Sequence, residues 1–406
     1  MHSEMTKTMP SLFDKCHQYT RADEVKKRGI YPWFRPIQES EGPVVKMGGN
    51  RVIMAGSNNY LGLTAHPKVK EAAIRALDQY GTSCSGSRFL TGTIELHEQL
   101  EVRLAKFIGK EATLLFSTGY QTSQGVIQPL VKRGDYILSD KDNHASIVAG
   151  NLVAKGGVGV QVLRYKHEDM ADLERRLSRL PIETGKLIVT DGVFSTFGKV
   201  ANVPEITKLA KKYNAQTLLD DAHAFGVVGE GGRGSASKFG LIEDVDLVMC
   251  TFSKTLASLG GFVAGTERVV NYLKHHSPAL IFSASPTPPS VAAALAALDI
   301  LEQEPERVKQ LYENANFVRQ GLKEIGFKVI DGETAIVPVL IGDDEQAFKL
   351  WTGLFNAGIF VNVFIAPATP PGKAMMRNSF MATHKKEHLE KVVTTYRTIG
   401  KQLGII

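Results

Sequence analysis

The feature that most constrains the fold is a series of short apolar runs between about residues 61 and 290, separated by amphipathic stretches. Runs of four to six apolar residues in this arrangement are typical of buried parallel strands joined by helices. Four of these runs are Ala112–Phe116, Leu187–Thr190, Thr217–Leu219 and Leu247–Cys250. The sequence therefore predicts an α/β fold whose mainly parallel central sheet is flanked by helices.

Three regions differ in pattern. Residues 1–60 form an N-terminal segment with a basic patch and an aromatic cluster, residues 61–290 a large α/β domain, and residues 291–406 a smaller α+β C-terminal domain. Apolar residues at helical spacing predict helices, and prolines before residue 290 favour a helix start there. The predicted elements are a helix at Glu95–Ile108, a helix at Ser290–Glu304, a strand near Ala335–Ile341 and a last helix near Lys385–Leu403.

The amino-acid composition indicates which kinds of molecule the chain can bind. The net charge of +6 over 406 residues, without a dense Lys/Arg stripe, argues against nucleic-acid binding. It suits anionic small molecules such as phosphates, carboxylates and acyl-thioester carriers. The three cysteines are widely spaced, which argues against a disulfide framework and a zinc site, so no metal is expected.

The chain shows no pattern that directs it into or across a membrane. The N-terminal stretch lacks the apolar core and small-residue cleavage site of a signal peptide. No apolar run approaches the roughly 18 residues that a membrane span requires. We therefore expect a cytoplasmic protein, for which peripheral membrane contact stays open.

Lys254 follows directly after one of the apolar runs, within Thr251–Lys254. A lysine just beyond a strand reaches the carboxyl edge of the sheet, where α/β folds bind ligands. Its amine could form a Schiff base with a carbonyl cofactor, and Thr251 and Ser253 could donate to a phosphate. A lone lysine in this place is most often a solvated surface charge, so the neighbouring strand ends matter.

Three further strand ends carry polar residues. Asp220 and Asp221 precede His223; one of these carboxylates could pair with a pyridinium N–H, or it could cap a helix. Gly119 and Tyr120 follow Ala112–Phe116 and leave free N–H groups for a phosphate at a helix start. His144 follows the strand-like run Asp135–Leu138 and could stack on a ring, although lone histidines are more often structural.

A glycine-rich stretch, Gly229–Gly234, fits GxGxxG by spacing alone. It follows a histidine-containing loop rather than a strand and opens no clear helix, so it is not a dinucleotide fingerprint. We expect a flexible turn there.

The ordered set of motifs resembles the α-oxoamine synthases, a family of fold-type-I enzymes that use pyridoxal 5′-phosphate (PLP). The resemblance runs from about Tyr31 to the C-terminus. It rests on the stretches Ser57–Leu63, Gly86–Thr93, Asp191–Ser195, Asp220–His223 and Thr251–Lys254. The family joins an amino acid to an acyl thioester with loss of CO₂, and it builds shared active sites in a homodimer.

The resemblance implies roles for individual residues of this chain. Lys254 would hold PLP and act as the base, Asp220 would pair with the pyridine nitrogen, His144 would stack on the ring, and His223 and Ser195 would lie near the phenolic oxygen. The implied phosphate contacts are Gly119, Tyr120, Thr251 and Ser253, completed from the neighbouring subunit by Ser283 and Ser285. The implied substrate-carboxylate contacts are Asn58 and Arg377, because guanidinium binds carboxylate bidentately.

Two stretches, Phe34–Gln38 and Met381–His384, are most similar to the bacterial serine palmitoyltransferases. This branch condenses L-serine with a long-chain acyl thioester, from CoA or acyl carrier protein, in the first step of sphingolipid synthesis. The chain departs from that branch at Ser83, Ser85 and Asn378, which add hydrogen-bond donors near the expected substrate pocket. These donors would suit L-cysteate, the substrate that starts sulfonolipid synthesis, so cysteate remains the alternative. An aminotransferase would share the fold and the lysine, and a non-catalytic subunit would lack Lys254.

Overall fold

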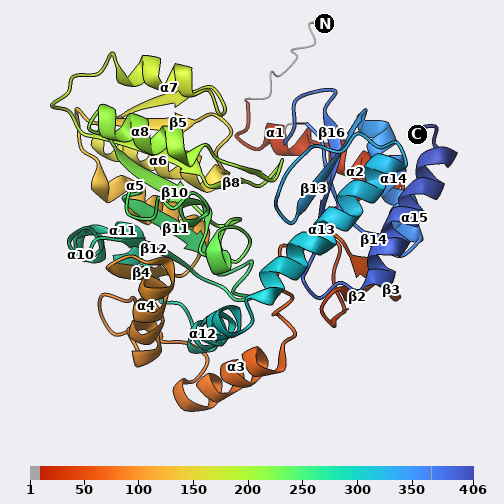
Figure 1. The fold of residues 1–406 in the computed structure, drawn as a ribbon, viewed down its shortest axis with the longest axis horizontal. Coiled ribbons are helices and arrows are strands. Elements are labelled where there is room, and N and C mark those ends of the chain that lie inside the picture. Colours follow the sequence, from red (N-terminus) through yellow and green to blue (C-terminus); the bar gives the residue numbers. More distant parts are fainter. Residues whose placement is uncertain (1–9, 367) are drawn as a thin grey trace, which may run out of the picture.

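The computed structural model describes residues 10–366 and 368–406, and its larger part is built on a seven-stranded sheet (Figure 1). The strand order is β4-β12-β11-β10-β7-β5-β6, in which β12 runs antiparallel to both neighbours and the other six strands run parallel to each other. The mainly parallel sheet predicted from the apolar runs is confirmed. The strands are β4 (Ala112–Phe116), β5 (Tyr136–Asp140), β6 (Gln161–Tyr165), β7 (Lys186–Asp191), β10 (Gln216–Asp220), β11 (Leu247–Thr251) and β12 (Gly261–Gly265).

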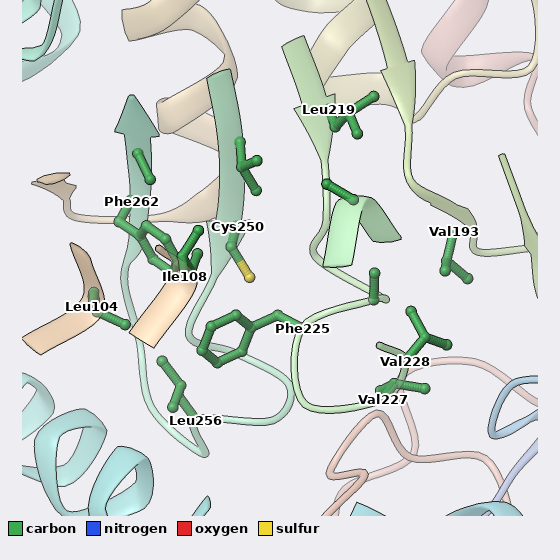
Figure 2. Close-up of a cluster of buried hydrophobic side chains, with 14 of the residues drawn as sticks. Leu104, Ile108, Val193, Leu219, Phe225, Val227, Val228, Cys250, Leu256 and Phe262 are labelled. Atoms are coloured by element: carbon green, nitrogen blue, oxygen red, sulfur yellow. The ribbon is translucent and has the colours of Figure 1, made fainter. Parts of the chain in front are cut away.

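The sheet is buried on both faces because successive strand residues enter two different cores. Leu218 of β10 packs with the helices on one face, and Leu219 packs with those on the other. Figure 2 shows part of the second core, where Leu104 and Ile108 gather against Cys250 and Phe262. The first face carries α5 (Gly119–Leu130), α6 (Ala145–Val158) and α10 (Glu267–His276); the second carries α4 (Glu95–Ile108), α7 (Met170–Leu177), α8 (Val203–Lys212) and α12 (Pro288–Gln303).

The smaller part, at the right of Figure 1, holds two sheets around a separate core. One sheet is antiparallel with the order β13-β16-β15, and the other has the order β1-β2-β3-β14. The N-terminal strands therefore pair with a strand from the C-terminal region. The strands are β1 (Glu39–Ser40), β2 (Val44–Met47), β3 (Asn50–Met54), β13 (Ile336–Gly342), β14 (Ile359–Phe360), β15 (Asn362–Phe364) and β16 (Ala374–Ser379). The helices are α1 (Asp14–His17), α2 (Arg21–Lys27), α13 (Glu306–Glu324), α14 (Asp344–Asn356) and α15 (Lys386–Gln402).

The predicted helices form close to their expected bounds. Helix α4 spans the predicted residues, and α12 starts at Pro288 rather than Ser290 because prolines fit the first helical turn, where their missing N–H has no partner. The domain boundaries at residues 60 and 290 stay a prediction. Because β3 pairs with β14, we propose that residues 10–60 fold as one unit with residues 291–366 and 368–406.

The glycine-rich stretch forms a turn, η1 (Glu230–Gly232), followed by the four-residue helix α9 (Ser235–Lys238). This is a turn, as predicted, but it is held in place rather than flexible. The Asp221 carboxylate accepts hydrogen bonds from the Ser235 N–H at 2.8 Å and from the Ser235 hydroxyl at 2.5 Å. A side chain at Gly234 would collide with that carboxylate, so the turn needs glycine there.

Within residues 10–366 and 368–406, none of the helices combines the length and apolar character needed to cross a bilayer.

Candidate active site

A cavity of about 280 Å³ opens at the carboxyl ends of β7, β10 and β11. The strands end there together because they run parallel, so residues that are far apart in the sequence meet at one edge. Eight of the predicted site residues line this cavity: Gly119, Tyr120, His144, Asp220, His223, Thr251, Ser253 and Lys254.

The N-terminus of α5 forms one wall of the cavity. Thr118 caps the helix by accepting the Gln121 N–H at 3.1 Å, and the preceding N–H groups stay free for an anion. Gly119 allows the helix to approach β11 closely, since a Cβ there would lie 2.5 Å from the Cβ of Thr251. The Thr251 and Ser253 hydroxyls lie 2.9 Å apart. Free N–H groups and two hydroxyls together form a cradle for a phosphate.

Two adjacent aspartates, Asp220 and Asp221, have different environments. Asp221 is tied to Ser235 in the glycine turn, and burial raises its pKa to about 6. Asp220 lines the cavity and accepts one hydrogen bond, from the Ala222 N–H at 3.0 Å. Asp220, rather than Asp221, is therefore available to a ligand.

Asp191 lies beside Asp220 because β7 and β10 are parallel and these two residues are register partners. Both carboxylates are buried, which raises the pKa of each, and the charge of Asp220 raises the pKa of Asp191 further. The positive charge of Lys254 opposes this effect on both carboxylates. The cavity therefore contains two adjacent carboxylates that can interact with a positively charged group.

Lys254 is half-buried and lines this cavity. Burial lowers the pKa of the amine, and the negative charge of Asp220 partly restores it. A lowered pKa gives a larger neutral fraction, which is the nucleophilic and basic form of a lysine.

Two histidines complete the wall. His144 caps α6, with Nδ1 2.8 Å from the Ser146 hydroxyl, and its backbone N–H donates to Asp191 at 3.0 Å. Nδ1 of His223 lies 2.6 Å from the hydroxyl of Tyr60. Burial lowers the pKa of both imidazoles, and Lys254 lowers them further.

Arg377 and Asn58 lie together next to the cavity but do not line it. Arg377 is buried on β16, and its Nη1 donates to Asn58 Oδ1 at 3.0 Å while its Nε donates to the Ser195 carbonyl at 2.9 Å. Tyr60 connects this pair to the cavity, because Nη2 of Arg377 lies 3.4 Å from its hydroxyl. Ser195 itself lines a neighbouring cavity of about 510 Å³ rather than the first one.

The expectation that Asn378 adds a donor to the substrate pocket is wrong. Successive residues of a strand point to opposite faces, so Asn378 faces away from the side that Arg377 occupies on β16. The Asn378 amide donates to the Val337 carbonyl at 2.9 Å, and its oxygen accepts the Tyr396 hydroxyl at 2.8 Å. Asn378 is a core residue of the smaller part of the molecule.

Besides Ser195, four predicted serines lie outside the cavity, and they are on two adjoining loops. The N–H and hydroxyl of Ser285 donate to the Gly86 carbonyl at 2.9 and 3.1 Å, which joins the loops. Ser83 and Ser85 are exposed, and Ser283 is half-buried. None of the four lines the cavity, and their roles remain predictions.

Four residues that the structure brings to the site have no role predicted from the sequence: Tyr60, Thr118, Ser146 and Asp191. Thr118 and Ser146 are small polar residues at helix starts, so the capping pattern could have identified them. Asp191 ends a predicted strand in the same way as Asp220. Tyr60 has no such signal, because its contact with His223 joins distant parts of the chain.

The residues present fit PLP. A helix N-terminus with two hydroxyls suits the phosphate, a buried carboxylate suits a protonated ring nitrogen, and a lysine amine with a lowered pKa suits the aldehyde. In the described part of the chain, no group of three or more His, Cys, Asp or Glu side chains is arranged to hold a metal ion. The fold and site are those of a fold-type-I PLP enzyme.

Comparisons with known proteins agree with this class. The family model for aminotransferase class I and II matches residues 50–395. A serine palmitoyltransferase of Sphingobacterium spiritivorum is 47% identical over 97% of this chain and 98% of that protein. An 8-amino-7-oxononanoate synthase of Thermoanaerobacter pseudethanolicus is 40% identical over 98% of this chain and all of that protein. The solved structure of a Sphingomonas wittichii serine palmitoyltransferase superposes with a TM-score of 0.93 at 35% identity, covering 98% of this chain and all of that one. The chain belongs to the aminotransferase class I and II family, and within it to the α-oxoamine synthases.

Proposed function

We propose that this chain condenses L-serine with a long-chain acyl thioester and releases CO₂, giving a 3-keto long-chain base in the first step of sphingolipid synthesis. The observation that carries the proposal is the cavity that brings Lys254 and Asp220 together beside the buried guanidinium of Arg377. The serine palmitoyltransferases that are 45–47% identical over nearly the whole chain support serine as the amino acid.

The residues of the chain divide the work between holding the cofactor and moving protons. Bound PLP would supply an electron sink for the electron pair left on the amino acid when its Cα loses a proton. Lys254 would hold the cofactor through its amine and would take the Cα proton, a role that its lowered pKa supports. Asp220 would accept a hydrogen bond from the ring nitrogen of the cofactor, and His144 would stack on its ring.

Arg377 binds the carboxylate of the amino acid and so sets the direction of the bond that finally breaks. Its guanidinium is fixed by Asn58, Ser195 and Ser379, which leaves few orientations open to it. A fixed guanidinium holds the Cα–carboxylate bond in one direction relative to the cavity, which favours loss of CO₂ after the carbon–carbon bond forms.

We further propose a homodimer in which the loop carrying Ser283 and Ser285 completes the phosphate site of the partner. The loop is at the surface, and Phe282 in it is 85% exposed. Such an exposed aromatic side chain next to a site is a feature of an interaction surface.

The test of substrate is a titration of the purified holoenzyme with L-serine, L-cysteate, glycine and L-alanine, followed by the absorbance of the bound cofactor. We expect serine to change the spectrum at the lowest concentration. Mass spectrometry of the product with palmitoyl-CoA or palmitoyl-acyl carrier protein then identifies the 3-keto base and the preferred carrier. Tighter binding of cysteate, together with a sulfonated product, would replace serine with cysteate in the proposal. With Asn378 in the core, the extra donors that favour cysteate are reduced to the exposed Ser83 and Ser85.

A further inference from the structure

Tyr60 occupies a position that none of the roles above explains. Its side chain is fully buried, and its hydroxyl lies between His223 of the cavity and Arg377 of the carboxylate site. The hydroxyl oxygen is 2.6 Å from His223 Nδ1, 3.4 Å from Arg377 Nη2 and 3.3 Å from Asn58 Oδ1.

The chemistry of these partners gives the hydrogen bonds a direction. A guanidinium has only donors, so the Tyr60 oxygen accepts from Arg377. The single phenolic proton can go to His223 Nδ1 or to Asn58 Oδ1, and the distances of 2.6 and 3.3 Å favour His223. Asn58 Oδ1 already accepts from Arg377 Nη1 at 3.0 Å. With the phenolic proton in the shorter bond, Nδ1 of His223 is an acceptor, and the imidazole proton lies on Nε2.

The charges around His223 also favour a neutral imidazole. Besides Tyr60, the titratable groups that act on this imidazole are Lys254, Arg377 and His144, and each of these three lowers its pKa. Together with burial they lower the pKa of His223 well below its ordinary range, which keeps the imidazole neutral. A neutral imidazole has one N–H, so the nitrogen that carries it decides what the histidine can do in the cavity.

We propose that Tyr60 is a positioning residue that holds His223 as the Nε2–H tautomer, so that His223 presents a hydrogen-bond donor to an oxygen of the cofactor or the amino acid. The inference rests on the proposed function for its substrate, but the tautomer itself depends only on contacts within this chain. Tyr60 acts through His223 and is not itself a catalytic residue.

The test compares holoenzyme carrying Tyr60→Phe with wild type. The variant loses one hydroxyl and keeps the ring, so PLP should still bind. We expect the pH midpoint of the absorbance change of the bound cofactor to move by about half a unit or more, and kcat to fall at least tenfold. The dissociation constant for L-serine, measured from the spectrum, should change by less than about threefold, because Arg377 keeps Asn58, Ser195 and Ser379 as partners.

Tyr396→Phe is the matched control. Tyr396 is also fully buried, and its hydroxyl donates to Asn378 in the core of the smaller part of the molecule. Its loss should lower stability and leave both the pH midpoint and kcat unchanged. A second background, His223→Gln, removes the imidazole whose tautomer is in question. There, Tyr60→Phe should cause no further shift of the pH midpoint.

An unchanged pH midpoint and kcat in Tyr60→Phe would overturn the proposal. An equal loss of kcat and of serine affinity would also overturn it, because Tyr60 would then only support Arg377. The pH titration needs no amino acid, so it tests the tautomer even if the enzyme proves to prefer a substrate other than serine.

Discussion

Among single residues, Lys254 offers the most direct test of the site, because the chemistry proposed here needs its amine. We expect borohydride reduction of the wild-type holoenzyme to fix PLP to the chain, which mass spectrometry detects as an increase in mass. Lys254→Ala should show no such increase and no condensation activity. Lys208→Ala, at an exposed lysine paired with Glu205 on α8, should behave as wild type. Covalent labelling of Lys254→Ala would place the attachment elsewhere.

Asn378 gives a second residue-scale prediction, in which stability changes and specificity does not. Asn378→Leu leaves the Tyr396 hydroxyl and the Val337 carbonyl without their buried partner, which costs roughly 1–3 kcal/mol for each unsatisfied group. Chemical denaturation should show this loss, while the ratio of serine to cysteate affinity stays the same. A changed ratio with unchanged stability would return Asn378 to the substrate pocket. The exposed Asn356 on α14 is the control position, where Asn356→Ala should leave both quantities unchanged.

The residues that sequence could locate are those at strand ends. Asp220, Lys254 and Gly119 each follow an apolar run, and parallel strands bring such positions to one edge. Asn378 was misplaced because the one-letter sequence does not show which face of a strand points to the site. The positions of Tyr60 and Ser195 at the site depend on how the two parts of the molecule pack, and this packing joins residues that are far apart in the sequence.

At the scale of elements, the start of α5 depends on its closeness to β11. Gly119→Ala would place a Cβ 2.5 Å from Thr251 Cβ, so the helix end must move away from the cradle. We expect the dissociation constant for PLP, measured by titrating the apoenzyme, to rise at least tenfold. Gly156→Ala in α6 meets no atom within 4 Å and should stabilise the chain by about 0.5–1 kcal/mol without changing PLP affinity. Unchanged PLP affinity in Gly119→Ala would mean that the cradle tolerates the displacement.

The start of α4 predicts a pH dependence of stability. His97 accepts the Ile94 N–H at Nδ1 and bonds the Pro286 carbonyl at Nε2, and burial lowers its pKa to about 4. As the pH falls below about 6.5, His97 therefore becomes protonated in the unfolded chain before it does in the folded chain. The folded state loses roughly 3 kcal/mol relative to the unfolded state by pH 4, and the full stability is present above pH 6.5.

Urea denaturation between pH 7 and pH 4 measures this dependence. We expect His97→Gln to be less stable at pH 7 but to lose less stability as the pH falls, because glutamine does not titrate. His17→Gln, at an exposed histidine of α1, should leave the pH dependence unchanged. If the free energy of unfolding changes with pH equally in wild type and His97→Gln, the pH dependence of stability comes from another group.

The strands that the sequence could predict are those whose residues are uniformly buried. The strands β4, β7, β10 and β11 are buried over most or all of their length, and their apolar runs indicate this. β6 lies at the sheet edge and is partly exposed, so Gln161–Tyr165 shows no apolar run. β12 is short and begins and ends with glycine, so its pairing between β4 and β11 comes from the sheet rather than from local preference.

At the scale of the whole molecule, we expect a homodimer whose interface includes the loop that carries Ser283 and Ser285. Phe282 and Leu90 near this loop are 85% and 75% exposed, which is unusual for large apolar side chains. Phe282→Asp should shift the sedimentation velocity from dimer toward monomer and weaken PLP binding. Tyr312→Asp, at a half-exposed position of α13, should sediment as wild type. A wild-type monomer that binds PLP fully would contradict the shared site.

The parallel pairing of β3 with β14 sets the order in which the chain can fold as it is made. Ile53 is made 306 residues (359 − 53) before its strand partner Ile359. At roughly 5–20 residues per second, β3 waits about 15–60 s for that partner. During this time β3 can pair with β2, but its other edge has no neighbouring strand. Any chain that ends prematurely before β14 therefore leaves the N-terminal strands without their parallel neighbour, and it is a natural substrate for chaperones and proteases.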